Sequence, residues 1–368
     1  MLLEKFYKGK KVFITGNTGF KGSWLTLWLK YFGAEVIGYS LPPPTNPNLF
    51  EILDLEKDIV YIVGDVRDIV KLKESIKIYR PDIVIHMAAQ PLVRYSYLYP
   101  KETYEINVIG TLNLFEAVRE CDSVRVVINV TSDKCYENKE WVYGYREEDP
   151  MGGYDPYSSS KGCAELLTSA YRNSFFNPKD YGVKHNVSVA SVRAGNVIGG
   201  GDWSEDRLIP DCIRALSKNE TIKLRKPEAV RPWQHVLEPL SGYLYLAYKM
   251  WKEPTKYSGG WNFGPEDDDI ITVEEIVKLV VSIWGKGEYS IIRNEDFHEA
   301  ALLKLDTSKA HFYLKWNRAY DVKTSLFETV EWYKNFYQGK ISMFDFTIEQ
   351  IKKYVRTAKE HNILWATE

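Results

Sequence analysis

The chain has 368 residues, enough to bury a substantial core, and its 48 basic and 50 acidic side chains give a formal net charge of -2 at pH 7. These charges are interspersed, so no basic tract favours nucleic acid or an anionic membrane as the main partner. The four cysteines have no metal-type spacing and no stretch approaches the roughly 20 apolar residues of a membrane span, so we expect a reduced, cytoplasmic protein without a metal site.

Residues 10–24, KKVFITGNTGFKGSW, combine a short apolar run with glycines and the start of a helical pattern. The run at 12–15 predicts a buried strand, and the pattern at 23–32 predicts an amphipathic helix. Between them lie three glycines, Gly16, Gly19 and Gly22. A strand, a tight turn and a helix N-terminus in this order present free backbone N–H groups to a pyrophosphate, which indicates a dinucleotide site. Close packing of strand on helix is an equally common use of such glycines, so the motif alone leaves both interpretations open.

Two further strands are predicted in the N-terminal part, at 35–39 and 59–63. Many NAD-binding folds end the second strand with an acidic residue that binds the ribose hydroxyls. Here Ser40 and a proline run follow instead, which leaves the choice between NAD and NADP open at this point. The third strand leads to Asp65, whose carboxylate either accepts a hydrogen bond from an adenine amino group or lies in a surface loop.

A fourth strand is predicted at 83–86, and it runs into the small residues Ala88 and Ala89. Small residues at the carboxyl end of a parallel strand let a ligand approach the backbone. The helix predicted at 103–119 carries apolar residues at helical spacing. Packing in the core or against a second subunit explains that stripe better than a cofactor contact.

The fifth and sixth strands are predicted at 124–130 and 187–192. A polar triplet follows the fifth strand: Ser132, Asp133 and Lys134. The helix between the two strands carries Tyr157 and Lys161 one turn apart, so both side chains project from the same face. Strands that alternate with helices at this spacing predict an α/β fold with a right-handed, doubly wound parallel sheet of the Rossmann type.

The regular alternation ends near Gly195, where we place the start of a second lobe. Helices are predicted at 211–216, 240–250, 273–284 and 326–337, and extended chain at 231–236. We expect a dinucleotide-binding domain of residues 1–194 and about 231–263, a smaller substrate-binding lobe of about 195–230 and 264–345, and a C-terminal helix or tail at 346–368.

Seven short motifs follow one another along the chain: TGNTGFKG, AAQPLVRYSY, TSDK, YSSSK, NVIGGGDW, DRLIPD and RPWQHV. Their order resembles the extended short-chain dehydrogenase/reductase family, and most closely its CDP-glucose 4,6-dehydratases, over roughly residues 8–340. The resemblance implies an NAD-dependent lyase that converts CDP-D-glucose into CDP-4-keto-6-deoxy-D-glucose and water. It also implies internal hydride transfer from carbon 4 to carbon 6, and a place in deoxysugar and lipopolysaccharide O-antigen biosynthesis.

The same resemblance implies a role for each residue of the catalytic group. Tyr157 would remove the proton of the carbon 4 hydroxyl, and Lys161 would stabilise the phenolate. Ser132 would hydrogen-bond the carbon 4 oxygen, and Asp133 would protonate the hydroxyl that leaves carbon 6. Lys134 would act either as the base at carbon 5 or as a cation that stabilises the enolate, and related dTDP-glucose dehydratases carry a glutamate at this position.

The resemblance also implies binding residues. The cofactor-binding set is Gly16, Asn17, Thr18, Gly19, Phe20, Lys21, Gly22, Asp65, Val66, Ala88, Ala89, Gln90, Tyr157 and Lys161. The substrate-binding set is Gln90, Arg94, Asn196, Arg207, Leu208 and Arg231. NAD is favoured over NADP because no arginine follows the second strand, although Lys21 could reach a phosphate. A homodimer is expected through the helices at 103–119 and 157–171, which would form a four-helix interface.

Two alternative functions stay open. Another nucleotide-sugar 4,6-dehydratase would share the whole catalytic group, whereas a nucleotide-sugar 4-epimerase needs Tyr157 and Lys161 but no acid and base for elimination. A non-catalytic dinucleotide sensor would share the fold, but such a protein has no chemical need for Tyr157, Lys161 and Asp133.

Overall fold

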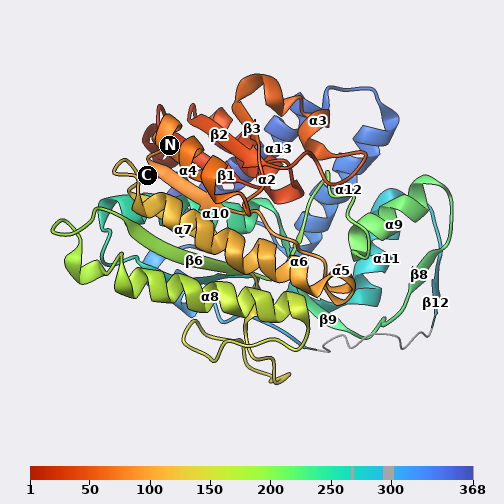
Figure 1. Ribbon diagram of the computed structural model, residues 1–368. Helices are drawn as coiled ribbons and strands as arrows, with labels where there is room; N and C mark the ends of the chain where they lie inside the picture. The colour runs from red at the N-terminus through yellow and green to blue at the C-terminus, as the bar shows by residue number, and fades with distance from the viewer. Residues whose placement is uncertain (267–268, 293–301, 368) are drawn as a thin grey trace.

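The computed structural model describes residues 1–266, 269–292 and 302–367, and a twisted parallel sheet lies at its centre (Figure 1). Within these residues the main sheet has seven strands in the order β10-β6-β5-β4-β1-β2-β3, and each neighbouring pair is parallel. The strands are β1 Lys11–Thr15, β2 Glu35–Ser40, β3 Val60–Val63, β4 Ile83–His86, β5 Val126–Val130, β6 Ser188–Ala194 and β10 Gly259–Phe263. The predicted doubly wound parallel sheet is confirmed.

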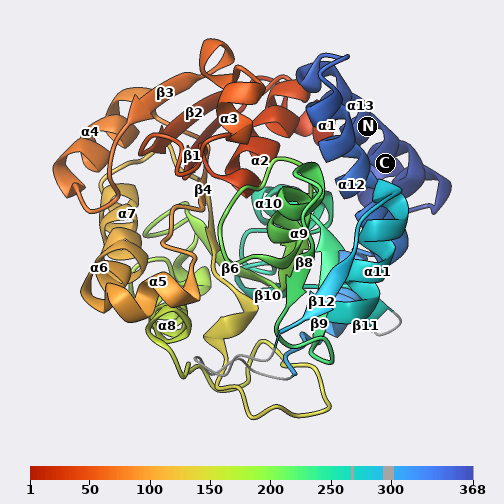
Figure 2. The same ribbon diagram turned by 90° about the vertical axis from the view of Figure 1, so that its right-hand side faces the viewer.

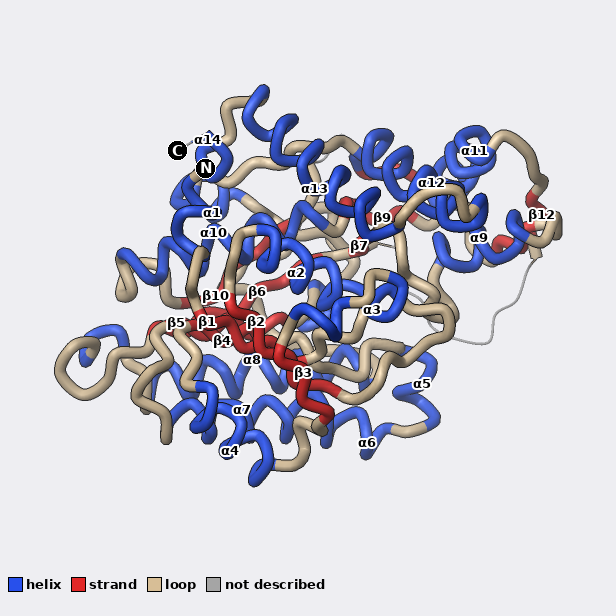
Figure 3. Tube along the Cα trace, turned by 90° about the horizontal axis from the view of Figure 1, so that it is seen from above, coloured by secondary structure: helices blue, strands red, loops and turns tan. Residues whose placement is uncertain are grey.

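Helices cover both faces of this sheet, and successive residues of β1 show how (Figure 3). Val12 and Ile14 pack in one core with α2 (Phe20–Tyr31) and α10 (Leu237–Lys252). Phe13 points the other way, into a core with α4 (Ile69–Tyr79) and α7 (Gly110–Arg119). Strands buried on both faces often consist of apolar runs, which is why β1, β4 and β5 could be recognised in the sequence. The edge strand β10, whose sequence is GGWNF, was not predicted.

Most of the remaining helices lie where helices were predicted, although their ends differ, but those at 2–7, 49–52 and 93–98 were not predicted. They are α1 Leu2–Tyr7, α3 Leu49–Ile52, α5 Val93–Leu98, α6 Pro100–Tyr104, α8 Pro156–Ser174, α9 Leu208–Ser217, α11 Val273–Trp284, α12 Val322–Gln338, α13 Met343–Glu360 and α14 Leu364–Thr367. Short 3-10 turns occur at η1 Leu55–Asp58, η3 Asp133–Cys135 and η4 Pro178–Asp180.

The predicted single helix at 103–119 is wrong in one respect. The π-helical turn η2 (Glu105–Ile109) separates α6 from α7, and a second such turn, η6 (Ala310–Leu314), precedes α12. In η2 the side chain of Asn107 bonds groups outside the helix. Apolar spacing did not reveal this π-turn, in which the apolar Ile109 is exposed and the polar Asn107 is buried.

Short strands lie beyond the carboxyl edge of the main sheet, close to α9 and α11 (Figure 2). β9 (Val230–His235) pairs in parallel with β7 (Asn196–Ile198) and antiparallel with β11 (Ile270–Thr272), while β8 (Ile222–Leu224) pairs with β12 (Tyr289–Ile291). The boundary expected at residue 231 places β9 with the dinucleotide-binding domain, but its hydrogen bonds join it to these small strands. The division into two lobes itself stays a prediction.

The glycine-rich segment after β7 packs against α12. A Cβ atom on Gly200 would lie 2.0 Å from Cγ of Trp332, so only glycine fits there. The next turn is tied to the same helix, because the backbone N–H of Asp202 donates to the Tyr333 hydroxyl at 2.9 Å. The Trp24 indole of α2 donates to the Gly200 carbonyl at 2.9 Å. This segment therefore joins three elements that are far apart in the sequence.

Candidate active site

The loop between β1 and α2 has the shape of a pyrophosphate cradle. Gly16 has a φ of 76°, and a Cβ atom there would lie 2.7 Å from the backbone nitrogen of Ala88. A Cβ on Gly22 would lie 2.1 Å from the Gly16 carbonyl oxygen. The loop and the start of α2 can therefore approach each other this closely only because both positions are glycine. Gly19 caps α2 without a side-chain hydrogen bond to the first turn. The first N–H groups of this helix and its dipole thus suit a dinucleotide phosphate.

Two neighbours of the glycines are held in place by β2 and the chain that follows it. The side chain of Asn17 is buried, and its Oδ1 accepts from the Ser40 hydroxyl at 2.7 Å. Thr18 donates its hydroxyl to the Leu41 carbonyl at 2.9 Å. The end of β2 therefore supports the glycine loop with a hydroxyl where an acidic residue is often found.

His86, at the end of β4, connects three elements beneath this loop. Thr15 Oγ1 accepts from the backbone N–H groups of Met87 and Ala88, at 3.1 and 3.2 Å, so its own proton is free for His86 Nδ1 at 2.6 Å. Thr111 donates its hydroxyl to a backbone carbonyl and lies 3.1 Å from His86 Nε2. This pattern places the ring proton on Nε2, and burial lowers the pKa of His86 to about 3. A neutral histidine thus fixes the small-residue segment that follows β4.

Gln90 uses its side chain within its own loop. Its Nε2 donates to the Thr103 hydroxyl at 2.9 Å, and its Oε1 accepts from the backbone of Leu92 at 2.6 Å. Asn107 of the π-turn accepts from the Gln90 backbone N–H at 2.9 Å and donates to the Ser160 hydroxyl of α8 at 2.8 Å. Sequence reasoning missed Asn107, which lies on a buried face of this helical segment together with Thr103 and Thr111.

Tyr157 and Lys161 lie side by side in the first turns of α8, and both are buried. Burial raises the pKa of Tyr157 to about 12, although the nearby Ser132 side chain acts in the opposite direction. Burial also lowers the pKa of Lys161 to about 8. The helix begins at a fixed point, because the Asp155 carboxylate accepts from the first turn and Pro156 occupies its first position.

Ser132 and Asp133 follow β5 at the same edge of the sheet. The Ser132 hydroxyl donates to Asp133 Oδ1 at 2.9 Å and accepts from the Lys134 backbone N–H at 3.2 Å. Asp133 is buried, and this burial raises the pKa of its carboxyl even though the charge of Lys134 lowers it. A carboxyl that holds its proton more firmly than usual is suited to act as an acid.

Lys21 points from the glycine loop toward the catalytic group. Its Nζ lies 3.3 Å from the Tyr243 hydroxyl of α10. Burial lowers the pKa of Lys21 to about 7, and the charges of Lys161 and Arg207 act in the same direction while Asp133 opposes them. The structure therefore brings Lys21 into the electrostatic field of the catalytic residues.

Two of the candidate substrate residues form ion pairs. Arg94 of α5 lies 3.0 Å from Asp206, and Arg207 donates to Asp202 at 2.9 Å. Leu208 begins α9 directly after these pairs. Two further candidates, Asn196 and Arg231, lie on the neighbouring strands β7 and β9.

Asp65 lies after β3, and its carboxylate already has a partner. Arg67 donates to it through Nε at 3.0 and 3.1 Å and through Nη2 at 2.6 Å. Val66 is buried, its carbonyl accepts from Asn113 at 3.0 Å, and a Cβ on Gly110 would lie 2.6 Å from its Cγ2. The predicted adenine contact of Asp65 stays a prediction, because the carboxylate is engaged with Arg67 in this structure.

Across residues 1–266, 269–292 and 302–367, no three His, Cys, Asp or Glu side chains gather to hold a metal ion. In the same ranges no helix is both long and apolar enough to span a membrane. The cysteines Cys121, Cys135, Cys163 and Cys212 are free thiols.

Comparisons with known proteins agree with this geometry. The chain matches the family described as GDP-mannose 4,6 dehydratase over residues 13–329. It is 54% identical over 341 residues to a CDP-glucose 4,6-dehydratase of Salmonella typhimurium, covering 92% of this chain and 95% of the relative. It is 26% identical over 337 residues to a UDP-glucose 4-epimerase of Halalkalibacterium halodurans, covering 89% of this chain and 97% of the relative.

A solved structure shows the same fold. The dTDP-glucose 4,6-dehydratase of Bacillus anthracis, in complex with NAD, superposes with a TM-score of 0.74 and 22% identity. The superposition covers 89% of this chain and 97% of the other. The two proteins therefore share one architecture over nearly their whole length.

Proposed function

This chain belongs to the GDP-mannose 4,6-dehydratase family, and within it we propose an NAD-dependent CDP-glucose 4,6-dehydratase that forms CDP-4-keto-6-deoxyglucose and water. The observation that carries the proposal is the 54% identity to a CDP-glucose 4,6-dehydratase over 92% of the chain. The buried cluster of Tyr157, Lys161, Ser132 and Asp133 supports it independently, because it combines a base for oxidation with an acid for elimination.

NAD, when bound, would accept a hydride from carbon 4 of the sugar and return it to carbon 6. The residues that would hold its phosphates are the glycines of the β1–α2 loop, whose conformation and close contacts only glycine permits. Asp65, Val66, Ala88 and Ala89 would contact the rest of the cofactor, since they follow β3 and β4 at the same edge of the sheet.

Tyr157 would take the proton of the carbon 4 hydroxyl. Its pKa of about 12 in the free protein is roughly five units above neutrality, which corresponds to about 7 kcal/mol at ~1.4 kcal/mol per unit. Lys161 lies on the same face of α8 one turn away, and its ammonium charge would favour the phenolate. Ser132 would hydrogen-bond the oxygen of carbon 4.

Elimination of water needs an acid at carbon 6 and help at carbon 5. Asp133 would supply the proton, because burial favours its neutral form. Lys134 would either remove the carbon 5 proton or stabilise the enolate as a cation. Asn196 and Arg231 would hold the substrate diphosphate, and Arg94, Arg207, Leu208 and Gln90 would line the rest of the substrate pocket.

The test is product formation from four nucleotide sugars. Purified protein with NAD would be incubated with CDP-, dTDP-, UDP- and GDP-linked hexoses, and the alkaline ultraviolet absorbance of a 4-keto-6-deoxy sugar would be measured. We expect product from CDP-glucose. Tyr157→Phe should bind CDP-glucose like the parent but turn over at least about a hundredfold more slowly. A 4-epimer of the substrate in place of a dehydrated product would overturn the proposal in favour of an epimerase.

Lys134 has a separate test. Lys134→Ala should still oxidise carbon 4 but stall before water is lost, so reduced cofactor should accumulate in a single turnover. Solvent deuterium should then enter carbon 5 more slowly than in the parent. A variant that incorporates deuterium and releases product at the parent rate would assign Lys134 to the scaffold.

We further propose a cytoplasmic homodimer that pairs α6, α7 and α8 with their copies. Ile109 of η2, between α6 and α7, and Leu166 of α8 are 45% and 61% exposed, and a two-fold interface would cover them. The free thiols suit a reducing compartment. A single-subunit mass by light scattering at micromolar concentration would contradict the dimer.

A further inference from the structure

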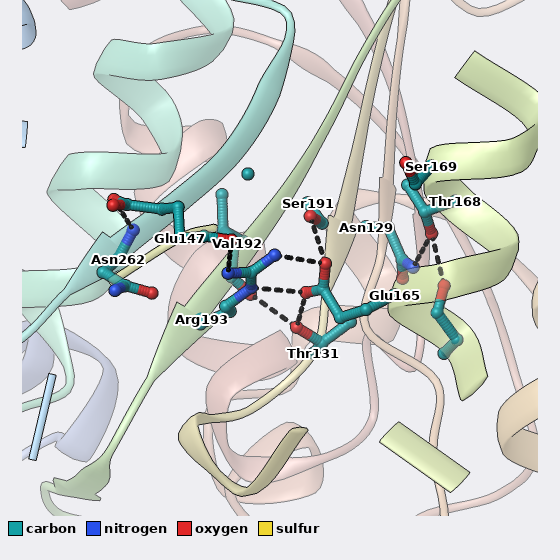
Figure 4. A network of polar contacts seen from close by, with 12 residues as sticks. Asn129, Thr131, Glu147, Glu165, Thr168, Ser169, Ser191, Val192, Arg193 and Asn262 are labelled. Atoms are coloured by element: carbon teal, nitrogen blue, oxygen red, sulfur yellow. Dashed lines mark hydrogen bonds and ion pairs between the residues drawn. The ribbon is translucent and has the colours of Figure 1, made fainter. Parts of the chain in front are cut away.

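A buried ion pair joins the helix that carries Tyr157 to the strand beside it (Figure 4). Glu165 of α8 and Arg193 of β6 are each only 4% exposed. Arg193 donates through Nε to Glu165 Oε1 at 2.9 Å and through Nη2 to Oε2 at 2.7 Å. This is the two-pronged geometry in which a guanidinium binds a carboxylate most firmly.

Two hydroxyls complete the shell of the Glu165 carboxylate (Figure 4). Thr131 donates to Oε1, and Ser191 donates to Oε2 at 2.7 Å. Burial acts to raise the pKa of Glu165, but Arg193 and these hydroxyls outweigh it and hold the pKa below its usual value. The carboxylate is therefore a charged acceptor. Its donors come from two strands of the sheet: Ser191 and Arg193 lie on β6, and Thr131 follows the end of β5.

The remaining nitrogen of Arg193, Nη1, contacts residues that follow Ser132, Asp133 and Lys134 in the chain. Its Nη1 donates to the Tyr136 hydroxyl at 2.6 Å and to the Glu147 carbonyl at 3.0 Å. Tyr136 in turn donates to Asn262 Oδ1 of β10 at 2.8 Å. A Cβ on Gly260 would lie 2.7 Å from Arg193 Nη2, so a glycine on β10 leaves room for the guanidinium.

The positions of these contacts along the chain are informative. Thr131 directly precedes Ser132, and Tyr136 follows Asp133 by three residues, so the ion pair holds both ends of the catalytic segment 131–136. Glu165 lies one helical turn beyond Lys161, on the helix face that also carries Tyr157. One buried pair thus connects the segment that carries Asp133 and Lys134 to the helix that carries Tyr157 and Lys161.

From this arrangement we propose that Glu165 and Arg193 are positioning residues, which set the catalytic segment 131–136 against the Tyr157–Lys161 face of α8. The proposal rests on the proposed dehydratase function, because it assigns elimination to Asp133 and Lys134 of this segment and deprotonation of the carbon 4 hydroxyl to Tyr157 of α8. The contact of Arg193 with Tyr136 then serves mainly elimination. The carboxylate of Glu165, which contacts both parts, serves oxidation and elimination together.

The first experiment compares two tyrosine variants that each lose one buried hydroxyl. Tyr136→Phe removes the contact with Arg193, while the control Tyr7→Phe removes a 2.9 Å bond to the Leu244 carbonyl far from the site. We expect Tyr136→Phe to lower kcat about tenfold or more with KM for CDP-glucose within about twofold. Reduced cofactor should accumulate at 340 nm in a single turnover, because elimination slows more than oxidation. The Tyr7→Phe variant should show neither change.

The second experiment removes the charge of Glu165 without changing its shape. Glu165→Gln should slow both the appearance of reduced cofactor and the release of product, whereas the control Glu328→Gln, a similarly buried glutamate on α12, should slow neither. Thermal melting of all four variants separates lost activity from lost fold. If Tyr136→Phe and Glu165→Gln melt at lower temperature but keep parent kinetics while folded, the pair is structural only and the proposal is overturned.

A third measurement needs no turnover. Hydrogen exchange followed by mass spectrometry should show faster exchange across residues 131–136 in Tyr136→Phe and Glu165→Gln, with β1 peptides unchanged. Unchanged exchange in that segment would overturn the proposal. If the parent makes no product from CDP-glucose, the proposed function fails, and this exchange result still decides whether the pair positions the segment.

Discussion

Two buried glutamates, Glu165 and Glu238, show how partners decide the state of a carboxyl group. They lie on α8 and α10, which cover opposite faces of the main sheet (Figure 3), and are 4% and 1% exposed. Glu165 binds a guanidinium and two hydroxyls, and its pKa is lowered. Burial raises the pKa of Glu238 to about 7.

The partners of Glu238 explain this difference. It accepts from the backbone N–H of Ala319 at 3.0 Å and of Tyr320 at 2.7 Å, and from the Tyr354 hydroxyl at 2.8 Å. Neutral donors of this kind compensate for burial less completely than a guanidinium fork. The comparison teaches that depth of burial alone does not predict the charge of a carboxyl group. Glu165 binds its partners as an ion. Glu238, whose pKa is close to neutral pH, accepts a hydrogen bond from Tyr354 of α13.

The largest expected effect comes from removing the cation beside Glu165. Arg193→Met leaves that carboxylate buried without its ion partner, which should cost about 3–5 kcal/mol in the free energy of unfolding. Urea denaturation measures the loss. The double variant Arg193→Met with Glu165→Leu removes both charges and should recover most of the stability. A loss below about 1 kcal/mol in the single variant would mean that the charged Glu165 does not depend on its guanidinium partner, and would contradict the contrast with Glu238.

The pH dependence of stability tests the other glutamate. Because the pKa of Glu238 is raised from 4.5 to about 7 in the folded state, the folded protein binds its proton more tightly than the unfolded chain. Its contribution is therefore full below about pH 4.5 and is lost as pH rises through 7, about 3 kcal/mol in total. Glu238→Gln should remove this component from a series of urea unfolding curves measured between pH 5 and 8. An unchanged slope would show that Glu238 is already ionised.

Tyr354 provides a smaller test on the same side. Its hydroxyl donates to Glu238 and lies 3.1 Å from the Ser241 hydroxyl, so Tyr354→Phe should cost about 1–2 kcal/mol. Thermal melting measures the cost, and turnover of the folded variant should match the parent. Slower turnover without a lower melting temperature would connect this region to catalysis and remove the contrast with Tyr136.

The smallest effect is expected from an ion pair in water. Lys73 and Glu120 lie 2.5 Å apart with side chains 30% and 61% exposed. Lys73→Ala should change the free energy of unfolding by less than about 1 kcal/mol, since water solvates both ions in the variant. A larger loss in urea denaturation would mean that burial is not what makes the pair at Arg193 important.

Much of this organisation could be predicted from the sequence because it depends on local patterns. Apolar runs marked the strands, and helical spacing paired Tyr157 with Lys161. The partner of Glu165 could not be predicted, because Arg193 follows it by 28 positions and only the packing of β6 against α8 brings them together. The hydrogen bonds of the Gln90 side chain to Thr103 and Leu92 could not be predicted either, because they depend on how the loop folds. Sequence motifs thus identified the candidate catalytic residues better than the buried residues that hold them in place.

The packing of Gly200 and Asp202 against α12 has a consequence for the order in which parts of the chain fold during synthesis. Tyr333, which bonds Asp202, follows it by 131 positions. At about 5–20 residues per second, a ribosome needs roughly 7 to 26 s to add that stretch. During this interval the first strands can already pair, while the glycine-rich segment lacks the helix α12 against which it packs. The nascent chain should therefore acquire a protease-resistant N-terminal half first, and the substrate side should become resistant only after α12 leaves the exit tunnel.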